Sequence, residues 1–331
     1  MHPTNPVTRP LTYAGAINEG LRQSMELSDD VVVFGQLVDY KSGIFGTTTG
    51  LVDRFGRKRV QDFPNSENLM TSVAMGAALA GLRPVIVHQR LDFMLYSLDA
   101  IANWLALWHF KSAGRSDMPV TIRTIVGKGW GQGPQHSKSL HAWFAHLPGL
   151  RVALPATADD AKGLLMESIF SETPAIFIEG RSLFSMSAEV PAAPYRVRFG
   201  EAVIRHAGAD VTLVSFGSMV PLALRAATAL SEEGIGVEVV DPRTLSPLDA
   251  ETICASVNKT KRLVVADPGW HSFGAAAEIV ALVAERLGTD LAAAPVRVAL
   301  PDSHTPVSVS LEKAYYPDEV LIRDAVRKTL Q

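Results

Sequence analysis

The stretch Val60–His88, which reads VQDFPNSENLMTSVAMGAALAGLRPVIVH, predicts a strand, a helix and a second strand in direct succession. Its two ends, Val60–Phe63 and Arg83–His88, are short runs of strand-forming residues. The region between them, Leu69–Gly81, consists mainly of Ala, Gly, Met and Leu, so it predicts a helix that packs closely against its neighbours. Two strands joined through a helix are typical of a parallel sheet, and this stretch therefore indicates an α/β fold.

The same alternation of short apolar runs and longer helical stretches continues on both sides. Further strands are expected at Asp30–Gly35, Pro119–Val126, Leu150–Pro155 and Ala175–Glu179. The apolar stretch Leu98–Phe110 has large aromatic residues at about helical spacing and predicts a helix that is buried or faces another subunit. Such near-continuous apolar strands are typical of a parallel sheet with helices on both faces.

A second alternating unit follows a polar, proline-bearing segment, Ser182–Tyr195, which we interpret as a linker. Its strands are expected at Val211–Phe216, Val237–Val240, Leu263–Ala266 and Val296–Ala299, and its helices at Val220–Glu233, Ala275–Leu287 and Asp318–Leu330. The sequence therefore predicts an α/β protein with two doubly wound, mainly parallel-sheet domains. We place the domains at residues 1–190 and 191–331.

Composition excludes several classes of function. The chain has 331 residues, 47% of them hydrophobic and 20% charged, which is an ordinary globular balance. A net charge of -3 gives no reason to expect nucleic acid or an anionic membrane as partner. Cys254 is the single cysteine, which excludes an internal disulfide and a cysteine-cluster metal site. We see neither a signal peptide nor a run of about 20 apolar residues, so a cytoplasmic protein is expected.

Common catalytic motifs of α/β proteins are missing. The glycine-rich stretch Gly127–Gly133, GKGWGQG, lacks the G-x-G-x-x-G spacing of dinucleotide-binding proteins. The chain has no G-x-x-x-x-G-K-[ST] loop, no G-x-S-x-G elbow and no H-E-x-x-H pair. His141 and His146 are five residues apart, so they do not share a helix face, and we interpret them as surface histidines of a helix.

Two polar segments follow apolar strands, at the edge where ligands of open α/β sheets bind. The first, Asp62–Glu67, leads directly into the predicted helix, and the second, Gly133–Ser139, contains His136. Taken alone, Glu67 is equally well explained as a carboxylate that favours the helix dipole. A lone histidine in such a loop is more often structural than catalytic.

Several long segments, in the same order along the chain, resemble a known family. They are PNSE at Pro64–Glu67, GAALAGLRPV at Gly76–Val85, QHSKSLHAWFAHLPGL at Gln135–Leu150, ADDAKGLL at Ala158–Leu165, PRTLSPLD at Pro242–Asp249 and KTKRLVVADPGW at Lys259–Trp270. The family comprises the beta subunits of the first, decarboxylating component of the 2-oxo-acid dehydrogenase complexes, which are transketolase-like thiamine-diphosphate enzymes. The resemblance implies a pyrimidine-binding domain followed by a transketolase C-terminal-type domain.

The resemblance also implies roles for individual residues. Glu67 matches the glutamate that bonds the aminopyrimidine ring of thiamine diphosphate, and Phe93 matches the aromatic residue that stacks on that ring, although core packing would also explain Phe93. His136 matches the active-site histidine that the family uses near the bound 2-oxo acid. Asn65 and Gln89 align with positions that line the cofactor, and both are more polar than the family pattern. We expect Glu67 and His136 to be catalytic.

Other departures from the family pattern lie near these residues. Gln36 stands where the family has a glutamate that is thought to link the two active sites, so that coupling is in doubt. His141 replaces a residue that is usually glutamate, glutamine or small. Thr305–Ser310 replaces the proline-and-tyrosine segment of the family. This difference is expected to alter the surface that contacts the lipoyl-bearing core.

The chain lacks the G-D-G motif followed by N that holds magnesium and the diphosphate in thiamine enzymes. The resemblance therefore implies a separate alpha subunit that supplies the magnesium ligands, with no metal ligand expected in this chain. An assembly of two alpha and two beta chains is expected. A lipoyl-bearing acyltransferase is a further expected partner.

Two enzymatic hypotheses stay open at this point. In the first, the enzyme forms a carbanion or enamine from a 2-oxo acid and passes the acyl group to a lipoyl acceptor. In the second, it is a carboligating or transketolase-like enzyme of a specialised biosynthetic pathway that transfers the unit to an aldehyde or another acceptor without a lipoyl partner. A third hypothesis, a scaffold without catalysis, is disfavoured because both Glu67 and His136 are present.

Overall fold

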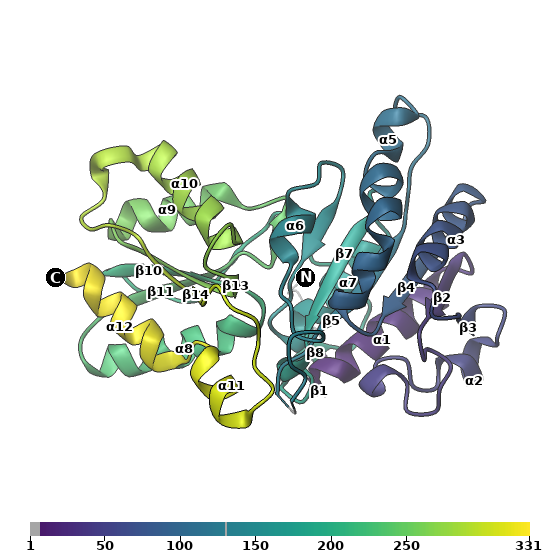
Figure 1. Ribbon diagram of the computed structural model, residues 1–331, viewed down its shortest axis with the longest axis horizontal. Helices are drawn as coiled ribbons and strands as arrows, with labels where there is room; N and C mark the ends of the chain where they lie inside the picture. Colours follow the sequence, from purple (N-terminus) through teal and green to yellow (C-terminus); the bar gives the residue numbers. More distant parts are fainter. Residues whose placement is uncertain (1–6, 130) are drawn as a thin grey trace, which may run out of the picture. The chain divides into compact units, whose positions relative to one another are not determined.

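The computed structural model describes residues 7–129 and 131–331 of the chain. The chain divides into two compact units, which we describe one at a time (Figure 1). The first consists of Met1–Gly127 and Phe144–Phe199, and the second of Lys128–Trp143 and Gly200–Gln331. The segment that carries His136 thus groups with the second unit, although it lies within residues 1–190 of the chain.

The first unit alternates strands with helices as the sequence predicts. Its elements are β1 (Thr8–Thr12), α1 (Tyr13–Leu27), β2 (Val31–Gly35), η1 (Ile44–Gly46), α2 (Leu51–Phe55), β3 (Val60–Asp62), α3 (Glu67–Leu79), β4 (Arg83–His88), α4 (Leu91–Met94), η2 (Leu95–Ser97), η3 (Ala100–Leu105), α5 (Trp108–Lys111), β5 (Thr121–Val126), β6 (Arg151–Ala153), α7 (Ala158–Ile169), β7 (Ala175–Gly180), η4 (Arg181–Leu183) and β8 (Ser187–Pro191). The short helix α6 (His141–Ala145) begins in the segment that groups with the second unit.

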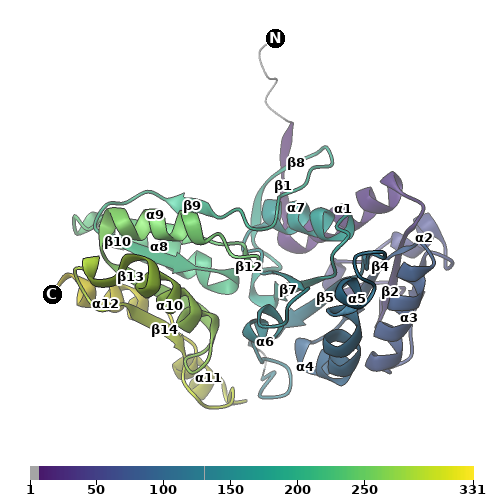
Figure 2. The same ribbon diagram turned by 90° about the horizontal axis from the view of Figure 1, so that it is seen from above.

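Its central sheet is parallel, with the strands of this unit in the order β6-β7-β5-β4-β2-β3. Valines of β2 and β4 pack on one face against α1 and α7, which lie side by side (Figure 2). The helix α3 packs against β4 and the following η2 and η3. Because helices pack on both faces of the sheet, its central strands β4 and β5 are buried along nearly their whole length.

The second unit is built on a sheet of its own, in the order β14-β13-β10-β11-β9. Its elements are β9 (Val203–His206), β10 (Val211–Ser215), η5 (Gly217–Met219), α8 (Val220–Glu232), β11 (Val237–Asp241), β12 (Thr244–Ser246), α9 (Ala250–Thr260), β13 (Leu263–Trp270), α10 (Ala275–Leu287), η6 (Gly288–Asp290), β14 (Val296–Leu300), α11 (Val309–Tyr315) and α12 (Glu319–Leu330). The helices α8 and α12 lie on one side of the sheet, and α9 and α10 lie on the other (Figure 1).

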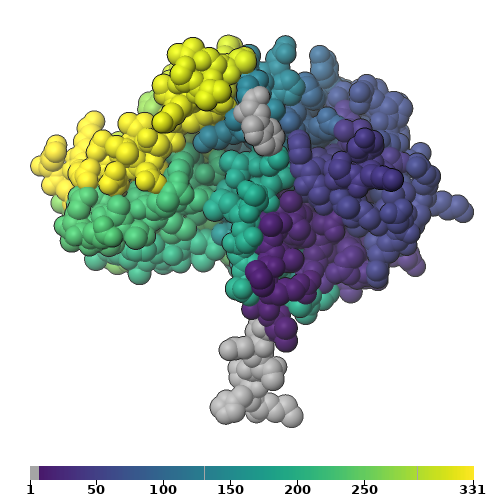
Figure 3. Space-filling view, turned by 90° about the horizontal axis from the view of Figure 1, so that it is seen from below, coloured from purple at the N-terminus to yellow at the C-terminus, as the bar shows by residue number. Residues whose placement is uncertain are grey.

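These two units confirm the predicted α/β class with mainly parallel, doubly wound sheets. Only β9 runs antiparallel to its neighbour within the second sheet. The prediction that Ser182–Tyr195 is a plain linker is wrong, because this segment contains β8. This strand pairs antiparallel with β1, and the purple N-terminal segment lies at the surface in Figure 3.

The helix predicted at Leu98–Phe110 also differs from expectation. The chain forms a π-helical turn at η3 and then the short α5. Trp104 is 43% exposed and Phe110 is 83% exposed, so these aromatic residues are not buried within the chain. Within the described residues, no helix is both long and apolar enough to span a membrane.

The buried His88 at the end of β4 predicts a pH dependence of stability. Burial lowers its pKa from 6.5 to about 3. The unfolded chain takes up this proton near pH 6.5, whereas the folded chain does so only near pH 3. The free energy of unfolding should therefore fall as pH decreases between these values, by about 1.4 kcal/mol per pH unit from this residue.

Urea unfolding at pH 7 and pH 5 measures this effect in the wild-type chain and in His88→Leu. Between the two pH values, the wild type should lose about 2 kcal/mol more than the variant, because only the wild type carries the imidazole. The other titrating groups are common to both chains and cancel in the comparison. Equal losses would contradict a neutral, buried His88.

Candidate active site

Glu67 is the first residue of α3 and lies just beyond the carboxyl end of β3. Its side chain is half-buried, and Ser66 precedes it as the residue at the helix start. A carboxylate in the first turn interacts favourably with the helix dipole. The position therefore suits a carboxyl group that is held in place and still reaches a ligand.

The side chain of Gln36 holds Glu67. Gln36 directly follows β2 and is only 5% exposed. Its Nε2 donates a hydrogen bond to Oε1 of Glu67 at 2.8 Å, and its Oε1 accepts the backbone N–H of Gln89 at 3.3 Å. Since β2 and β4 are neighbours in the sheet, this one amide ties together the ends of two strands and the start of α3.

Close approach of the backbone at Gly35 makes this arrangement possible. A β-carbon on Gly35 would overlap the backbone of Val87 in the neighbouring strand. Only glycine fits there, and the next residue, Gln36, donates its own backbone N–H to the carbonyl of Val87 at 3.1 Å. The sequence marked Gln36 only as a lost carboxylate, whereas the structure gives it a positioning role.

The other residues predicted for the cofactor site lie on adjoining segments of the first unit. Gln89 is half-buried and is joined to Glu67 through Gln36. Phe93 is half-buried on α4, four residues after Gln89, and Asn65 is exposed two residues before Glu67. The structure thus brings Glu67 and Gln89 together, with Phe93 and Asn65 on the segments that flank them.

His136 lies in the loop between β5 and α6, in the segment that groups with the second unit. It is half-buried, and its Nδ1 is 3.0 Å from the carbonyl oxygen of Gln132. A carbonyl oxygen only accepts, so Nδ1 carries the proton in this bond. In the neutral imidazole Nε2 is then the nitrogen able to accept a proton.

The interpretation of His141 as a surface histidine is wrong. His141 is 1% exposed, and its Nε2 lies 2.9 Å from Oδ1 of Asp267, which is fully buried. Its ring also meets Phe216 edge-on, with the ring centroids 5.5 Å apart. His146, in contrast, is exposed as predicted.

Asp267 is a functional candidate that the sequence did not single out. Its oxygens also accept the backbone N–H groups of Gly269 at 2.7 Å and Ala276 at 2.8 Å. Burial by itself would raise the pKa of Asp267, but the charge and hydrogen bond of His141 and the two backbone donors hold it below the usual value. An aspartate directly after the apolar run Leu263–Ala266 was the sequence signal for such a group.

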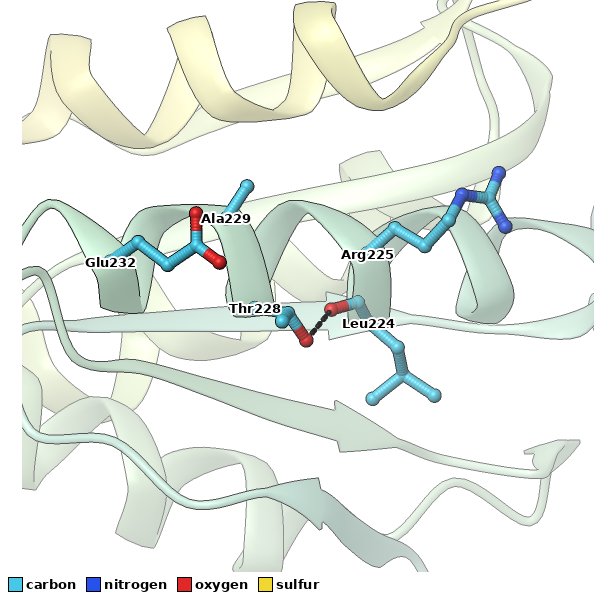
Figure 4. Close-up of a pocket in the computed structure, with 5 residues that line it drawn as sticks. All are labelled: Leu224, Arg225, Thr228, Ala229 and Glu232. Atoms are coloured by element: carbon cyan, nitrogen blue, oxygen red, sulfur yellow. Dashed lines mark hydrogen bonds between the residues drawn. The ribbon is translucent and has the colours of Figure 1, made fainter.

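One surface pocket lies on α8 and contains none of the predicted site residues (Figure 4). Leu224, Arg225, Thr228, Ala229 and Glu232 line it, all from this one helix. Thr228 donates its hydroxyl to the carbonyl of Leu224 at 3.0 Å, as side chains on helices commonly do. The pocket therefore offers no convergent catalytic groups, and the candidate site rests on Glu67 and the residues around it.

Comparison with known proteins gives matches to two protein families. Residues 9–186 match the family described as "Transketolase, pyrimidine binding domain". Residues 200–322 match the family described as "Transketolase, C-terminal domain". A solved structure titled "Split gene transketolase, inactive beta4 tetramer" has the same fold, with a TM-score of 0.77 and 24% identity over 97% of this chain and 98% of that chain.

Relatives with higher identity span almost the whole chain. The "Acetoin:2,6-dichlorophenolindophenol oxidoreductase subunit beta" of Cupriavidus necator is 39% identical, over 98% of this chain and 99% of its own length. The "Pyruvate dehydrogenase E1 component subunit beta" of Staphylococcus epidermidis is 38% identical, and that of Bacillus subtilis is 37% identical, each over 97% of this chain and 99% of its own length.

Proposed function

Because the chain belongs to the family of beta subunits of 2-oxo-acid dehydrogenase first components, we propose that it works as the beta subunit of a thiamine-diphosphate-dependent enzyme that decarboxylates a 2-oxo acid. The family resemblance found in the sequence is confirmed by relatives that match nearly end to end. The single observation that carries the site assignment is the half-buried Glu67 carboxyl, held by Gln36 at the carboxyl edge of a parallel sheet.

The residues around Glu67 fit the pyrimidine end of thiamine diphosphate. When bound, this cofactor would supply a nucleophilic carbon and an electron sink for the decarboxylation of a 2-oxo acid. Glu67 holds or shares a proton at its carboxyl group, and the bond from Gln36 fixes one of its two oxygens. Phe93 offers an aromatic face for stacking, and Gln89 and Asn65 add polar groups beside the ring.

We assign to His136 the proton that moves at the substrate. The bond from Nδ1 to the carbonyl of Gln132 fixes the tautomer and leaves Nε2 as the atom that exchanges a proton. An imidazole is suited to this task because its ordinary pKa lies close to neutral pH.

Membership of a family of beta subunits implies a partner alpha subunit. An exposed apolar stripe on α3, directly after Glu67, supports this: Leu69 is 50% exposed and Val73 is 39% exposed, and Gly76 and Ala80 continue the stripe at helical spacing. We propose that the alpha chain covers this stripe and binds the diphosphate and magnesium. An assembly of two alpha and two beta chains in the cytoplasm, with a lipoyl-bearing acyltransferase as acceptor, completes the proposal.

Reconstitution tests the proposed reaction. The chain is co-purified with its alpha chain and given pyruvate, branched 2-oxo acids or acetoin together with a lipoyl domain. Release of carbon dioxide from a 2-oxo acid and acylation of the lipoyl domain, both dependent on thiamine diphosphate and magnesium, are expected. Release of a ligated hydroxyketone without acylation would favour the carboligating alternative, and no thiamine-dependent turnover would overturn the proposal.

A further inference from the structure

The loop that carries His136 needs support from outside. Gly129, Gly131 and Gly133 lie in this loop with φ values of +82°, +67° and +62°, which side-chain-bearing residues rarely adopt. Glycine leaves the backbone many accessible conformations, so the loop by itself would not hold an imidazole in one place. Contacts within the second unit supply this restraint at both ends of the loop.

Helix α11 and the segment before it hold the first end. Oε1 of Glu312 accepts the backbone N–H of Gly129 at 2.7 Å. The Lys128 ammonium lies 4.4 Å from the centre of the Tyr316 ring. Val307 packs against the loop so closely that a β-carbon on Gly133 would come within 2.8 Å of it. Val307 belongs to the segment Thr305–Ser310, in which the sequence departs from the family pattern.

The His141–Asp267 hydrogen bond holds the second end. His141 follows His136 by five residues and begins α6. Asp267 is fixed in turn, because it accepts the backbone N–H groups of Gly269 and Ala276. Its carboxylate is fully buried, and Nε2 of His141 is its third hydrogen-bond donor. Because Asp267 is already held by two backbone donors, the bond fixes the position of His141.

We propose that the His141–Asp267 pair is a positioning device for the reaction: it sets the loop so that His136 presents Nε2 to the substrate. This inference rests on the proposed function, since it gives His136 its role. His141 acts through His136 and does not touch the substrate itself. The hydrogen bond from Gly129 to Glu312 and the contact of Val307 with Gly133 fix the opposite end of the same loop. We call these contacts and the His141–Asp267 pair together the clamp.

Two substitutions of His141 separate positioning from mere folding. His141→Leu removes the donor to Asp267, whereas His141→Gln keeps an N–H at nearly the same reach. In the complex with the alpha chain, H141L should lower kcat by about 10- to 100-fold with KM changed by less than about threefold, because misplacement of a catalytic group acts on the chemical step. H141Q should restore kcat to within about threefold of the wild type.

The exposed His146 provides the matched control, and His146→Leu should leave kcat unchanged. If H141L fails to assemble, His141→Asn replaces it, because its shorter side chain stays polar but falls short of Asp267. Equal losses in H141Q and in the variant without the bond would overturn the proposal. Full activity without the bond would overturn it as well.

A second readout keeps this inference separate from the proposed function. Carbethoxylation of His136 by diethylpyrocarbonate, followed by mass spectrometry of the complex, reports how the loop is held without any turnover. The rate at His136 should rise in H141L and return to the wild-type value in H141Q. If the wild-type complex has no thiamine-dependent activity but these rates behave as expected, the proposed function fails while the clamp stands. Identical rates in all three complexes would overturn the clamp.

Discussion

Replacing Glu67 with glutamine is expected to lower kcat of the assembled enzyme by about 100- to 10,000-fold. Glutamine has nearly the same shape and still accepts the hydrogen bond from Gln36 at its carbonyl oxygen, but it can neither hold nor share the proton that a carboxyl group provides. The fold should be unaffected, because Glu67 is only half-buried at the start of a helix.

Steady-state turnover of the complex with its alpha chain, at saturating thiamine diphosphate, measures this effect. The matched control is Glu251→Gln, in which an exposed carboxylate on α9 loses its charge, and this variant should keep wild-type kcat. Size-exclusion chromatography checks that both variants still assemble. Unchanged turnover in E67Q would contradict the catalytic role of Glu67 and would favour the hypothesis that the chain is a scaffold without catalysis.

The second large effect is expected from His136→Gln. Loss of the imidazole should lower kcat by about 100-fold or more, since the proton exchanged at Nε2 has no replacement. Binding of thiamine diphosphate, measured by titration of the complex, should stay within about threefold of the wild type, because the cofactor contacts are assigned to Glu67 and its neighbours.

His146→Gln is the control for this variant, since His146 is exposed on the same stretch of chain. It should lose neither turnover nor cofactor binding. A His136→Gln complex that binds the cofactor weakly but turns over at the wild-type rate when saturated would assign His136 to cofactor binding. That outcome would contradict its role at the substrate.

The central strands were predictable because burial on both faces leaves short, mainly apolar runs. The strand Arg83–His88 has the predicted bounds, and Ala275–Leu287 does so among the helices. In contrast, β1 and β8 each contain a proline and polar residues, and they pair only with each other at an edge, where proline is tolerated. Local periodicity therefore gave no signal for either strand.

Contacts between distant parts of the chain explain what the sequence missed at the site. The bond from Gln36 to Glu67 depends on β2 and β4 being neighbours in the sheet, which no local pattern reveals. In the sequence, His141 was compared only with the nearby His146, and that comparison gave it no partner. Its burial follows from Asp267, which lies 126 residues away. Glu67 and His136 were predicted as site residues only through the family resemblance, since each residue taken alone also fitted a structural role.

The most direct test of the account is a titration of thiamine diphosphate with magnesium into the beta chain alone, the alpha chain alone and the two together. Glu67 of this chain is proposed to bind the pyrimidine ring, whereas the residues that bind the diphosphate and magnesium are proposed to belong to the alpha chain. Tight binding and turnover are therefore expected only for the mixture, and Glu67→Gln should lower the turnover of the mixture by at least about 100-fold. Tight binding and full turnover by the beta chain alone would contradict the account.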